Sequence, residues 1–270
     1  MHRIYSERKI ITHLPRVPLQ GDLFLTYRCN NNCRHCWDRV ADCRKERRKE
    51  LSLEEIKSIV SQAKRSGTQE WSLSGGEPLL REDFLDIFMY IKENSRACSL
   101  NTNGRLITRK IAPFLRGPGA KLVSLYGATE KTHDYITRRP GSFQETISGA
   151  RYLKEANVYF IMQVIVLKDN LHELEKMVSL AKTLGKGCSF GDSWLYLSAS
   201  GDPEINREIV RQRIPAEQSL RIDPFEEPCL EDKGRILVCK SNLFHFCDCI
   251  EGRRFFINPY GGMSFCYLIQ

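Results

Sequence analysis

The stretch Cys29-Asn30-Asn31-Asn32-Cys33-Arg34-His35-Cys36 places three thiols within eight residues, directly after an apolar run. Soft thiolate ligands at this Cys-x3-Cys-x2-Cys spacing select zinc or an iron–sulfur cluster. A structural zinc site normally closes its tetrahedron with a fourth protein ligand. His35 could supply it, but it lies between two of the cysteines in the same tight loop. Three thiolates on a four-iron cluster leave one iron open, which favours a catalytic centre.

The size and cysteine content of the chain indicate where it works. A chain of 270 residues can bury a large core without disulfides. Eleven cysteines occur, yet the polar start from Met1 to Lys9 is unlike a secretory signal. Clustered cysteines in a reducing compartment favour metal or redox chemistry, and no apolar run approaches the roughly 18 residues that a membrane span requires. We therefore expect a soluble, cytoplasmic protein without a membrane anchor.

A net charge of +8 and the dense run from Arg44 to Lys49 raise the possibility of nucleic-acid binding. An acidic residue interrupts this run and no aromatic residues are interleaved with it, as is typical of a solvated connector. We do not expect nucleic acid to be a partner.

From Gly21 onward, apolar β-rich runs alternate with amphipathic helical stretches about six times, which predicts a parallel α/β sheet covered by helices. A full eight-fold barrel takes about 250 residues, so we predict an open, partial (βα)6 TIM-like barrel over residues 21–198. Ligands of such folds bind at the carboxyl ends of the strands, where the cysteine stretch lies. The predicted strands are Leu23–Tyr27, Glu70–Leu73, Ala97–Leu100, Leu122–Tyr126, Val158–Leu167 and Ser193–Leu197.

Helix starts are indicated by capping residues three positions before a glutamate: Ser52 with Glu55, Ser142 with Glu145, and Asn170 with Glu173. Around the barrel, residues 1–20 form an N-terminal extension. Residues 199–228 are rich in charge and proline and read as a linker, with a possible helix over Glu204–Arg213. Residues 229–270 carry five cysteines and form a small cysteine-rich C-terminal extension.

The cysteine loop resembles that of the radical S-adenosylmethionine (radical SAM) enzymes, whose signature is Cys-x3-Cys-x-aromatic-Cys after the first strand of a partial (βα)6 barrel. His35 stands at the aromatic position. The turn Ser74-Gly75-Gly76-Glu77-Pro78 after the second predicted strand resembles the family's Gly-Gly-Glu-Pro turn, which faces the methionine end of S-adenosylmethionine. Glycine allows close approach of the backbone to a ligand. The resemblance implies a 4Fe–4S cluster on Cys29, Cys33 and Cys36.

Other stretches resemble further parts of the family's cofactor site. Asn103, in Asn101-Thr102-Asn103-Gly104, resembles the family's Thr-Asn-Gly turn, although an ordinary Asn-Gly turn reads the same way. Ser124 lies where relatives bind the ribose. In the stretch from His133 to Phe143 the position that relatives fill with arginine is Thr137, so Arg138 is a displaced candidate for the cofactor carboxylate. The cofactor-binding residues that the resemblance implies are His35, Ser74, Gly75, Gly76, Glu77, Asn103, Ser124 and Arg138, while His133 and Asp134 are expected to orient the loop and cap a turn.

The C-terminal extension resembles the beginning of a SPASM or twitch module, an extension of this superfamily that binds auxiliary iron–sulfur clusters. Cys249, Gly261 and Cys266 fit its opening pattern, Cys247 is a further candidate ligand, and Phe255 to Gly261 read as a short hairpin. The pattern is incomplete, because the later cysteines of a full module are absent. An auxiliary cluster on Cys247, Cys249 and Cys266 is therefore a hypothesis.

The resemblance implies a one-electron reductive cleavage of S-adenosylmethionine into methionine and a 5′-deoxyadenosyl radical, which takes a hydrogen atom from the substrate. Likeness to peptide maturases favours a ribosomally made peptide, modified by cross-linking, thioether formation or epimerisation. A separate leader-binding protein and a reductase or flavodoxin-type electron donor would then be partners. The alternatives are a porphyrin or haem-pathway enzyme and a non-catalytic metal-binding or scaffold protein. No catalytic residue is assigned.

Overall fold

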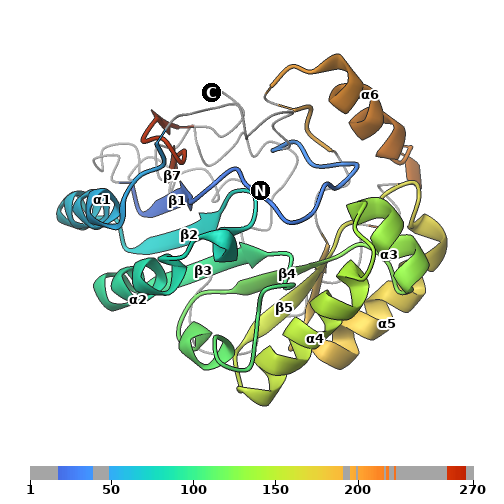
Figure 1. Cartoon of the computed structure of the whole chain (residues 1–270), viewed down its shortest axis with the longest axis horizontal. Coiled ribbons are helices and arrows are strands. Elements are labelled where there is room, and N and C mark those ends of the chain that lie inside the picture. Colours follow the sequence, from blue (N-terminus) through green and yellow to red (C-terminus); the bar gives the residue numbers. More distant parts are fainter. Residues whose placement is uncertain are drawn as a thin grey trace, which may run out of the picture.

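Six parallel strands alternate with helices along the chain, and this order places the site (Figure 1). The computed structural model describes residues 18–38, 49–190, 195–198, 200–215, 217–218, 222 and 254–265. The strands are β1 (Gln20–Phe24), β2 (Glu70–Ser74), β3 (Ala97–Thr102), β4 (Lys121–Leu125), β5 (Phe160–Val164), β6 (Cys188–Phe190), β7 (Arg254–Ile257) and β8 (Met263–Ser264). The helices are α1 (Leu53–Arg65), α2 (Phe84–Asn94), α3 (Glu130–Thr137), α4 (Ser142–Glu155), α5 (Leu174–Leu184) and α6 (Pro203–Gln212), with short 3-10 turns η3 (Pro78–Leu80), η4 (Ala112–Leu115) and η5 (Leu171–Glu173).

The sheet has the order β6-β5-β4-β3-β2-β1-β7-β8 and, over the described residues, does not close. This confirms the prediction of an α/β partial barrel. Strand residues such as Leu23, Leu73 and Leu100 are completely buried, and the apolar stripes of the helices pack on them. Parallel strands covered by helices bury their apolar side chains on both faces, so the sheet forms a firm base for the loops at its carboxyl edge.

The first strand has a second neighbour, β7, from the C-terminal extension. β7 pairs in parallel with β1, and β8 returns antiparallel to it, which confirms the predicted hairpin. Phe255 packs edge-on against Trp71 with ring centroids 5.6 Å apart, and Phe256 lies 6.4 Å from Phe24. The hairpin therefore extends the barrel sheet. Cys247, Cys249 and Cys266 lie outside the described residues.

Three sequence predictions about element boundaries are wrong: the sixth strand and two of the three helix caps. The sixth strand is Cys188–Phe190, whereas the described part of the predicted Ser193–Leu197 strand, residues 195–197, has no strand structure. The capping box of Ser52 and Glu55 is present. Ser142, in contrast, is the first residue of α4 and its hydroxyl donates to Asp134.

The helix cap predicted from Asn170 and Glu173 is not formed. Asn170 donates to the carbonyl oxygens of Tyr126 and Ile165. Glu173 accepts from the backbone and hydroxyl of Thr129. These polar side chains join neighbouring loops instead of capping their own helix.

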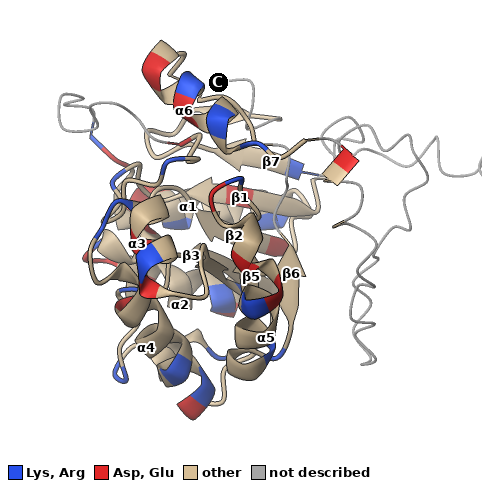
Figure 2. Cartoon of the chain, turned by 90° about the vertical axis from the view of Figure 1, so that its right-hand side faces the viewer, with Lys and Arg blue, Asp and Glu red and all other residues tan. Residues whose placement is uncertain are grey.

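The predicted helix over Glu204–Arg213 is confirmed as α6, which stands beside α3 on the carboxyl side of the sheet (Figure 1). Charges of both signs lie together on α6 (Figure 2): Glu204, Arg207, Glu208 and Arg211. The basic run after Cys43 lies outside the described residues except for Lys49. None of the described helices is long and apolar enough to cross a membrane.

Candidate active site

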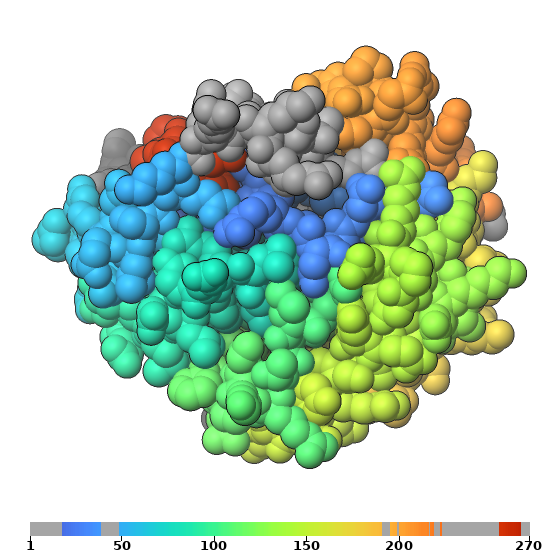
Figure 3. Space-filling view, in the orientation of Figure 1, coloured from blue at the N-terminus to red at the C-terminus, as the bar shows by residue number. Residues whose placement is uncertain are grey.

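The cysteine loop leaves the carboxyl end of β1 and runs toward α3, passing below α6 (Figure 1). In the space-filling view this blue segment surfaces between the cyan α1 side and the yellow-green α3 side (Figure 3). Two backbone bonds hold it to the end of α3: Asn32 donates to Thr137 at 2.9 Å, and Arg34 donates to Ile136 at 3.0 Å. The loop is thus a fixed part of the carboxyl edge.

The three thiols lie close together but differ in exposure. Cys33 is buried, Cys36 is half-buried and Cys29 is exposed. Cys33 and Cys36 belong to an apolar group that also contains Tyr126 and, from α6, Ile205 and Ile209. Burial raises the pKa of Cys33 well above its ordinary value, and the sulfurs of Cys36 and Cys29 raise it further. Buried thiols become thiolates when a positively charged metal centre compensates their charge.

Three thiols on one loop can each bind a different iron of a four-iron cluster. Among the described residues, no three His, Cys, Asp or Glu side chains are close enough to share one metal ion. In a four-iron cluster each cysteine binds a different iron, so the sulfurs lie near one another without meeting at one point. Cys29, Cys33 and Cys36 as the ligands of such a cluster stay a prediction.

The Gly-Gly-Glu turn after β2 is locked to the chain that leads into the cysteine loop. Gly76 donates its N–H to Thr26 at 2.7 Å and Glu77 donates to Arg28 at 2.8 Å. A Cβ on Gly76 would lie 2.2 Å from the Arg28 carbonyl oxygen, and Gly75 has a φ of +122° with the Thr26 oxygen 2.4 Å from its would-be Cβ. Both glycines are therefore required by contact with the chain itself.

Glu77 continues this connection to the third strand. Its side chain is completely buried. One carboxylate oxygen accepts from the Thr102 hydroxyl at 2.8 Å and from the Leu79 amide at 3.2 Å, and the other accepts from the Asn103 amide at 2.8 Å. Burial raises the pKa of Glu77 to about 7. The carboxylate joins two turns of the carboxyl edge, and its contact with a cofactor stays a prediction.

Asn103 connects this turn to the cysteine loop. Its side-chain amide donates to the Asn30 side chain at 2.6 Å and lies 3.9 Å from the Cys29 sulfur. Its own carbonyl oxygen accepts from Thr146 of α4 at 2.9 Å. Asn103 therefore touches one of the three thiols, and its contact with a cofactor stays a prediction.

Ser124 and His35 approach the thiols through Tyr126. The Tyr126 hydroxyl is hydrogen-bonded to Ser124 and to Cys33. The His35 ring lies 4.8 Å from the Tyr126 ring, centroid to centroid. Ser74 is half-buried at the end of β2, next to the Gly-Gly-Glu turn. The structure thus brings these predicted residues to the same edge as the cysteines.

His133 and Asp134 support the site from α3. Asp134 accepts from the Gly141 amide at 2.5 Å and from the Phe143 amide at 2.8 Å, so it caps α4. The His133 ring is completely buried between the rings of Tyr126 and Phe143, at 5.4 and 5.6 Å. Burial lowers the pKa of His133 to about 4, which keeps it neutral near pH 7. Asp134 caps the turn as expected, whereas the expected orienting role of His133 stays a prediction.

Arg138 lies at the C-terminal end of α3, with a φ of 54°. It forms an ion pair with Glu208 of α6, and Arg34 of the cysteine loop donates to the same carboxylate at 2.8 Å. Thr137, at the position that arginine fills in relatives, is buried and bonded to the Ser142 hydroxyl at 2.7 Å. Arg138 also lines a groove of about 1080 Å³ between α3 and residues 169–173. Its contact with the cofactor stays a prediction.

Sequence reasoning missed three contributors to this site: Arg105, the Tyr126 hydroxyl and Glu208. Arg105 directly follows the Asn103-Gly104 turn, and Tyr126 ends the stretch that contains Ser124, so their positions next to predicted site residues were the available signal. Glu208 has no such signal, because α6 reaches the cysteine loop only in the folded chain.

Comparisons with known proteins agree with this geometry. A family model described as "Radical SAM superfamily" matches residues 23–181. The AdoMet-dependent heme synthase of Methanosarcina barkeri is 38% identical over 163 residues, which are 60% of this chain and 46% of that protein. The subtilosin biosynthesis protein AlbA of Bacillus subtilis is 24% identical over 257 residues, 93% of this chain and 55% of AlbA.

Among solved structures, Streptococcus suis SuiB bound to precursor peptide SuiA has a TM-score of 0.63 at 16% identity. That match covers 94% of this chain and 60% of SuiB, and at this identity it shows the fold alone. The chain spans about half the length of the curated relatives it matches.

Proposed function

The chain belongs to the radical SAM superfamily, and on that premise we propose that it cleaves S-adenosylmethionine reductively and removes a hydrogen atom from a peptide. Family membership implies a 4Fe–4S cluster and S-adenosylmethionine as cofactors. The observation that carries the proposal is the proximity of Cys29, Cys33 and Cys36 on a loop whose entry is hydrogen-bonded to the Gly-Gly-Glu turn.

When bound, the cluster and S-adenosylmethionine supply the electron transfer and the radical chemistry. The chain's own residues position and shield them. Ile205 and Ile209 of α6 exclude water from the side of Cys33 and Cys36. The Gly76 backbone fixes the turn that faces the cofactor, and the Tyr126 hydroxyl orients the Cys33 sulfur.

The extent of the likenesses favours a peptide substrate. The likeness to AlbA, whose name places it in bacteriocin biosynthesis, runs over 93% of the chain, and the fold likeness to SuiB with its precursor peptide runs over 94%. The likeness to heme synthase covers 60%. In this proposal a separate leader-binding protein presents the peptide, and a reductase or flavodoxin-type protein supplies the electron.

Porphyrin side-chain modification is the second candidate. The observation in its favour is sequence identity. The chain is 38% identical to the Methanosarcina barkeri heme synthase over 163 residues, whereas it is 24% identical to AlbA over 257 residues. The described residues do not separate the two substrates, because both chemistries use the same cofactor and the same carboxyl edge of the sheet.

The deciding experiment is anaerobic reconstitution of the full chain with iron and sulfide, followed by dithionite and S-adenosylmethionine. We expect absorbance near 400 nm and formation of 5′-deoxyadenosine. A reconstituted cluster without cofactor cleavage would overturn the enzyme assignment and favour a scaffold. Stoichiometric zinc without that absorbance would overturn the cluster itself.

Substrate class is tested in the same assay with two probes. One is a small Cys- or Gly-rich peptide encoded beside the gene, made with deuterated amino acids, and the other is an iron porphyrin that carries deuterated propionate side chains. We expect deuterium to enter 5′-deoxyadenosine from the peptide and the peptide mass to change. Deuterium transfer from the porphyrin alone would overturn the peptide proposal and leave the superfamily assignment intact.

A further inference from the structure

Arg105 is a buried cation that joins three elements at the carboxyl edge. It follows the turn after β3, and its side chain is 5% exposed. One terminal nitrogen, Nη1, donates to the Asn30 carbonyl oxygen at 2.5 Å and to the Asn31 side-chain oxygen at 2.7 Å. Its Nε donates to Glu145 of α4 at 2.5 Å. A single guanidinium therefore holds the cysteine loop, the β3 turn and α4 together.

The segment that Arg105 holds begins immediately after Cys29. Asn103 binds the same segment through the Asn30 side chain and also reaches the Cys29 sulfur at 3.9 Å. The Cys29 side of the loop is thus supported by a pair of residues from the β3 turn. The planar fork of arginine suits this task, because it can donate in several fixed directions at once.

The other arginines of the loop region are arranged differently. Arg34 donates to Glu208, whose side chain is only 14% exposed, and Arg28 is 54% exposed beside Glu50. The carboxylate partner of Arg105, Glu145, is 50% exposed and well solvated. Solvent screens an exposed charge more strongly than a buried one. Arg105 therefore offers the loop a positive charge that its partner compensates only in part.

We propose that Arg105 is a positioning residue for the iron–sulfur cluster: it fixes the Asn30–Asn31 segment beside Cys29, and its charge favours the reduced state. One-electron reduction adds a negative charge to the cluster, so a nearby buried cation stabilises the product. The inference rests on the cluster that the superfamily implies and is independent of the substrate class.

The test compares Arg105→Gln and Arg105→Lys in the reconstituted full chain, without S-adenosylmethionine or substrate. Dithionite is the reductant, the midpoint potential is followed by EPR, and iron per chain is measured after gel filtration. For Arg105→Gln we expect about a tenfold smaller equilibrium constant for reduction, equivalent to about 59 mV for one electron. Arg105→Lys keeps the charge, so its potential should stay close to wild type while its iron content falls.

Arg109→Gln is the matched control, because Arg109 is 73% exposed and pairs with Glu155 on the surface. It should leave both readouts unchanged. Wild-type potential and iron content in Arg105→Gln would overturn the proposal. If Arg105→Gln does not fold, Arg105→Lys decides: wild-type iron content in that variant would equally overturn it. A wild-type chain that binds no iron would instead refute the cofactor assignment.

Discussion

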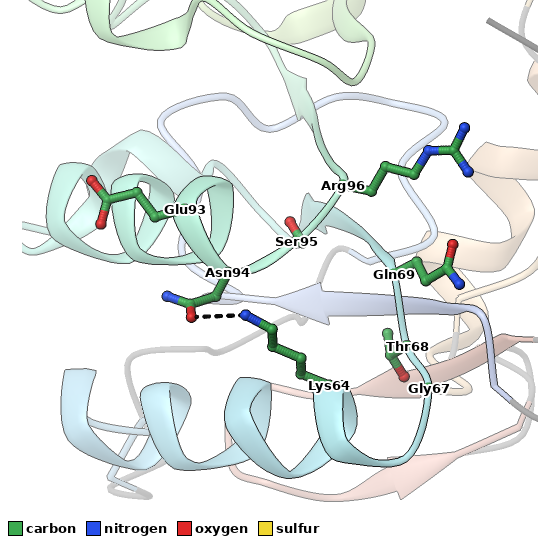
Figure 4. Close-up of a pocket in the computed structure, with 8 residues that line it drawn as sticks. All are labelled: Lys64, Gly67, Thr68, Gln69, Glu93, Asn94, Ser95 and Arg96. Carbon is green, nitrogen blue, oxygen red and sulfur yellow. Dashed lines mark hydrogen bonds between the residues drawn. The ribbon is translucent and has the colours of Figure 1, made fainter.

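The amino end of the parallel sheet carries an open surface hollow, whereas the carboxyl end carries buried polar side chains that connect the loops around the thiols. At the amino end, a hollow of about 360 Å³ is lined by Lys64, Gln69, Glu93, Arg96 and neighbouring residues, and Lys64 donates to the Asn94 side chain across it at 3.3 Å (Figure 4). At the carboxyl end, buried polar groups such as Glu77 connect loop to loop. An open hollow needs no such connections, whereas a site that holds a cluster does. The candidate site is therefore marked by the hydrogen bonds from Glu77 and Asn103 that connect the turns around the thiols, and not by the surface hollow.

The largest effect should come from the thiols themselves. Cys33→Ala removes a buried ligand, so we expect loss of the 400 nm absorbance, of most bound iron and of 5′-deoxyadenosine formation. Cys98→Ala is the matched control, because Cys98 is buried in β3, among the apolar core residues of the sheet. It should keep the cluster. If Cys33→Ala still forms 5′-deoxyadenosine, Cys33 is not a cluster ligand. The carboxyl end of the sheet would then no longer be distinguished from the amino end by this ligand.

Gly76→Ala tests whether the carboxyl edge is locked by backbone contact. The added Cβ would lie 2.2 Å from the Arg28 carbonyl oxygen, which cannot move without displacing the cysteine loop. We expect a loss of about 3 kcal/mol in the free energy of unfolding, measured with urea. Gly187→Ala, before β6 at the amino end, has open space around its Cβ and should change stability by less than about 1 kcal/mol. Equal losses at both positions would contradict the comparison.

Asp22 lies in β1, between the two ends, and its effect should depend on pH. Burial raises the pKa of Asp22 to about 6, although Arg254 of β7 lies 3.1 Å away. The folded chain therefore holds this proton more tightly than the unfolded chain and loses stability as the pH rises from about 4 to 6. At 1.36 kcal/mol per pKa unit the loss is at most about 3 kcal/mol. Asp22→Asn should remove it.

The check is urea unfolding of wild type and Asp22→Asn between pH 4 and 8. The free energy of unfolding of Asp22→Asn minus that of wild type should increase as the pH rises. Asp83→Asn is the control. Its hydrogen bond with Arg81 lowers the pKa of Asp83, so the stability that Asp83 gives is lost only as the pH falls below about 4, and the difference between this variant and wild type should stay constant between pH 4 and 8. If the difference in free energy of unfolding between Asp22→Asn and wild type does not change with pH, burial does not raise the pKa of Asp22.

The sequence predicted what depends on local pattern and missed what depends on distant contacts. Period and spacing were enough for the order of the parallel strands, the place of the cysteine loop and the existence of α6. The sixth strand was misplaced because Cys188–Phe190 is short and less apolar than the segment after it. The cap of α4 comes from Asp134, which belongs to another helix. Arg105 and Glu208 act on the cysteine loop across 75 and 174 positions, and no local pattern records such pairs.

The smallest effect expected at the carboxyl end concerns α6. Glu208→Gln removes the charge that holds Arg34 and Arg138, at a side chain only 14% exposed. Hydrogen bonds to charged groups contribute about 2 kcal/mol, so we expect a loss of that order in the free energy of unfolding. Because α6 also covers Cys33, the 400 nm absorbance should decay faster in air.

Two controls separate this effect from ordinary surface charge. Glu204→Gln removes an ion pair with Arg207 on the same helix, where the Glu204 side chain is 81% exposed. Lys64→Ala empties part of the hollow at the amino end. Each should change the free energy of unfolding by less than about 0.5 kcal/mol and leave the decay of the cluster unaltered. If Glu208→Gln changes the free energy of unfolding and the decay of the cluster as little as these two variants do, α6 neither stabilises nor shields the cysteine loop. The polar connections of the carboxyl end would then come from the loops between the strands alone.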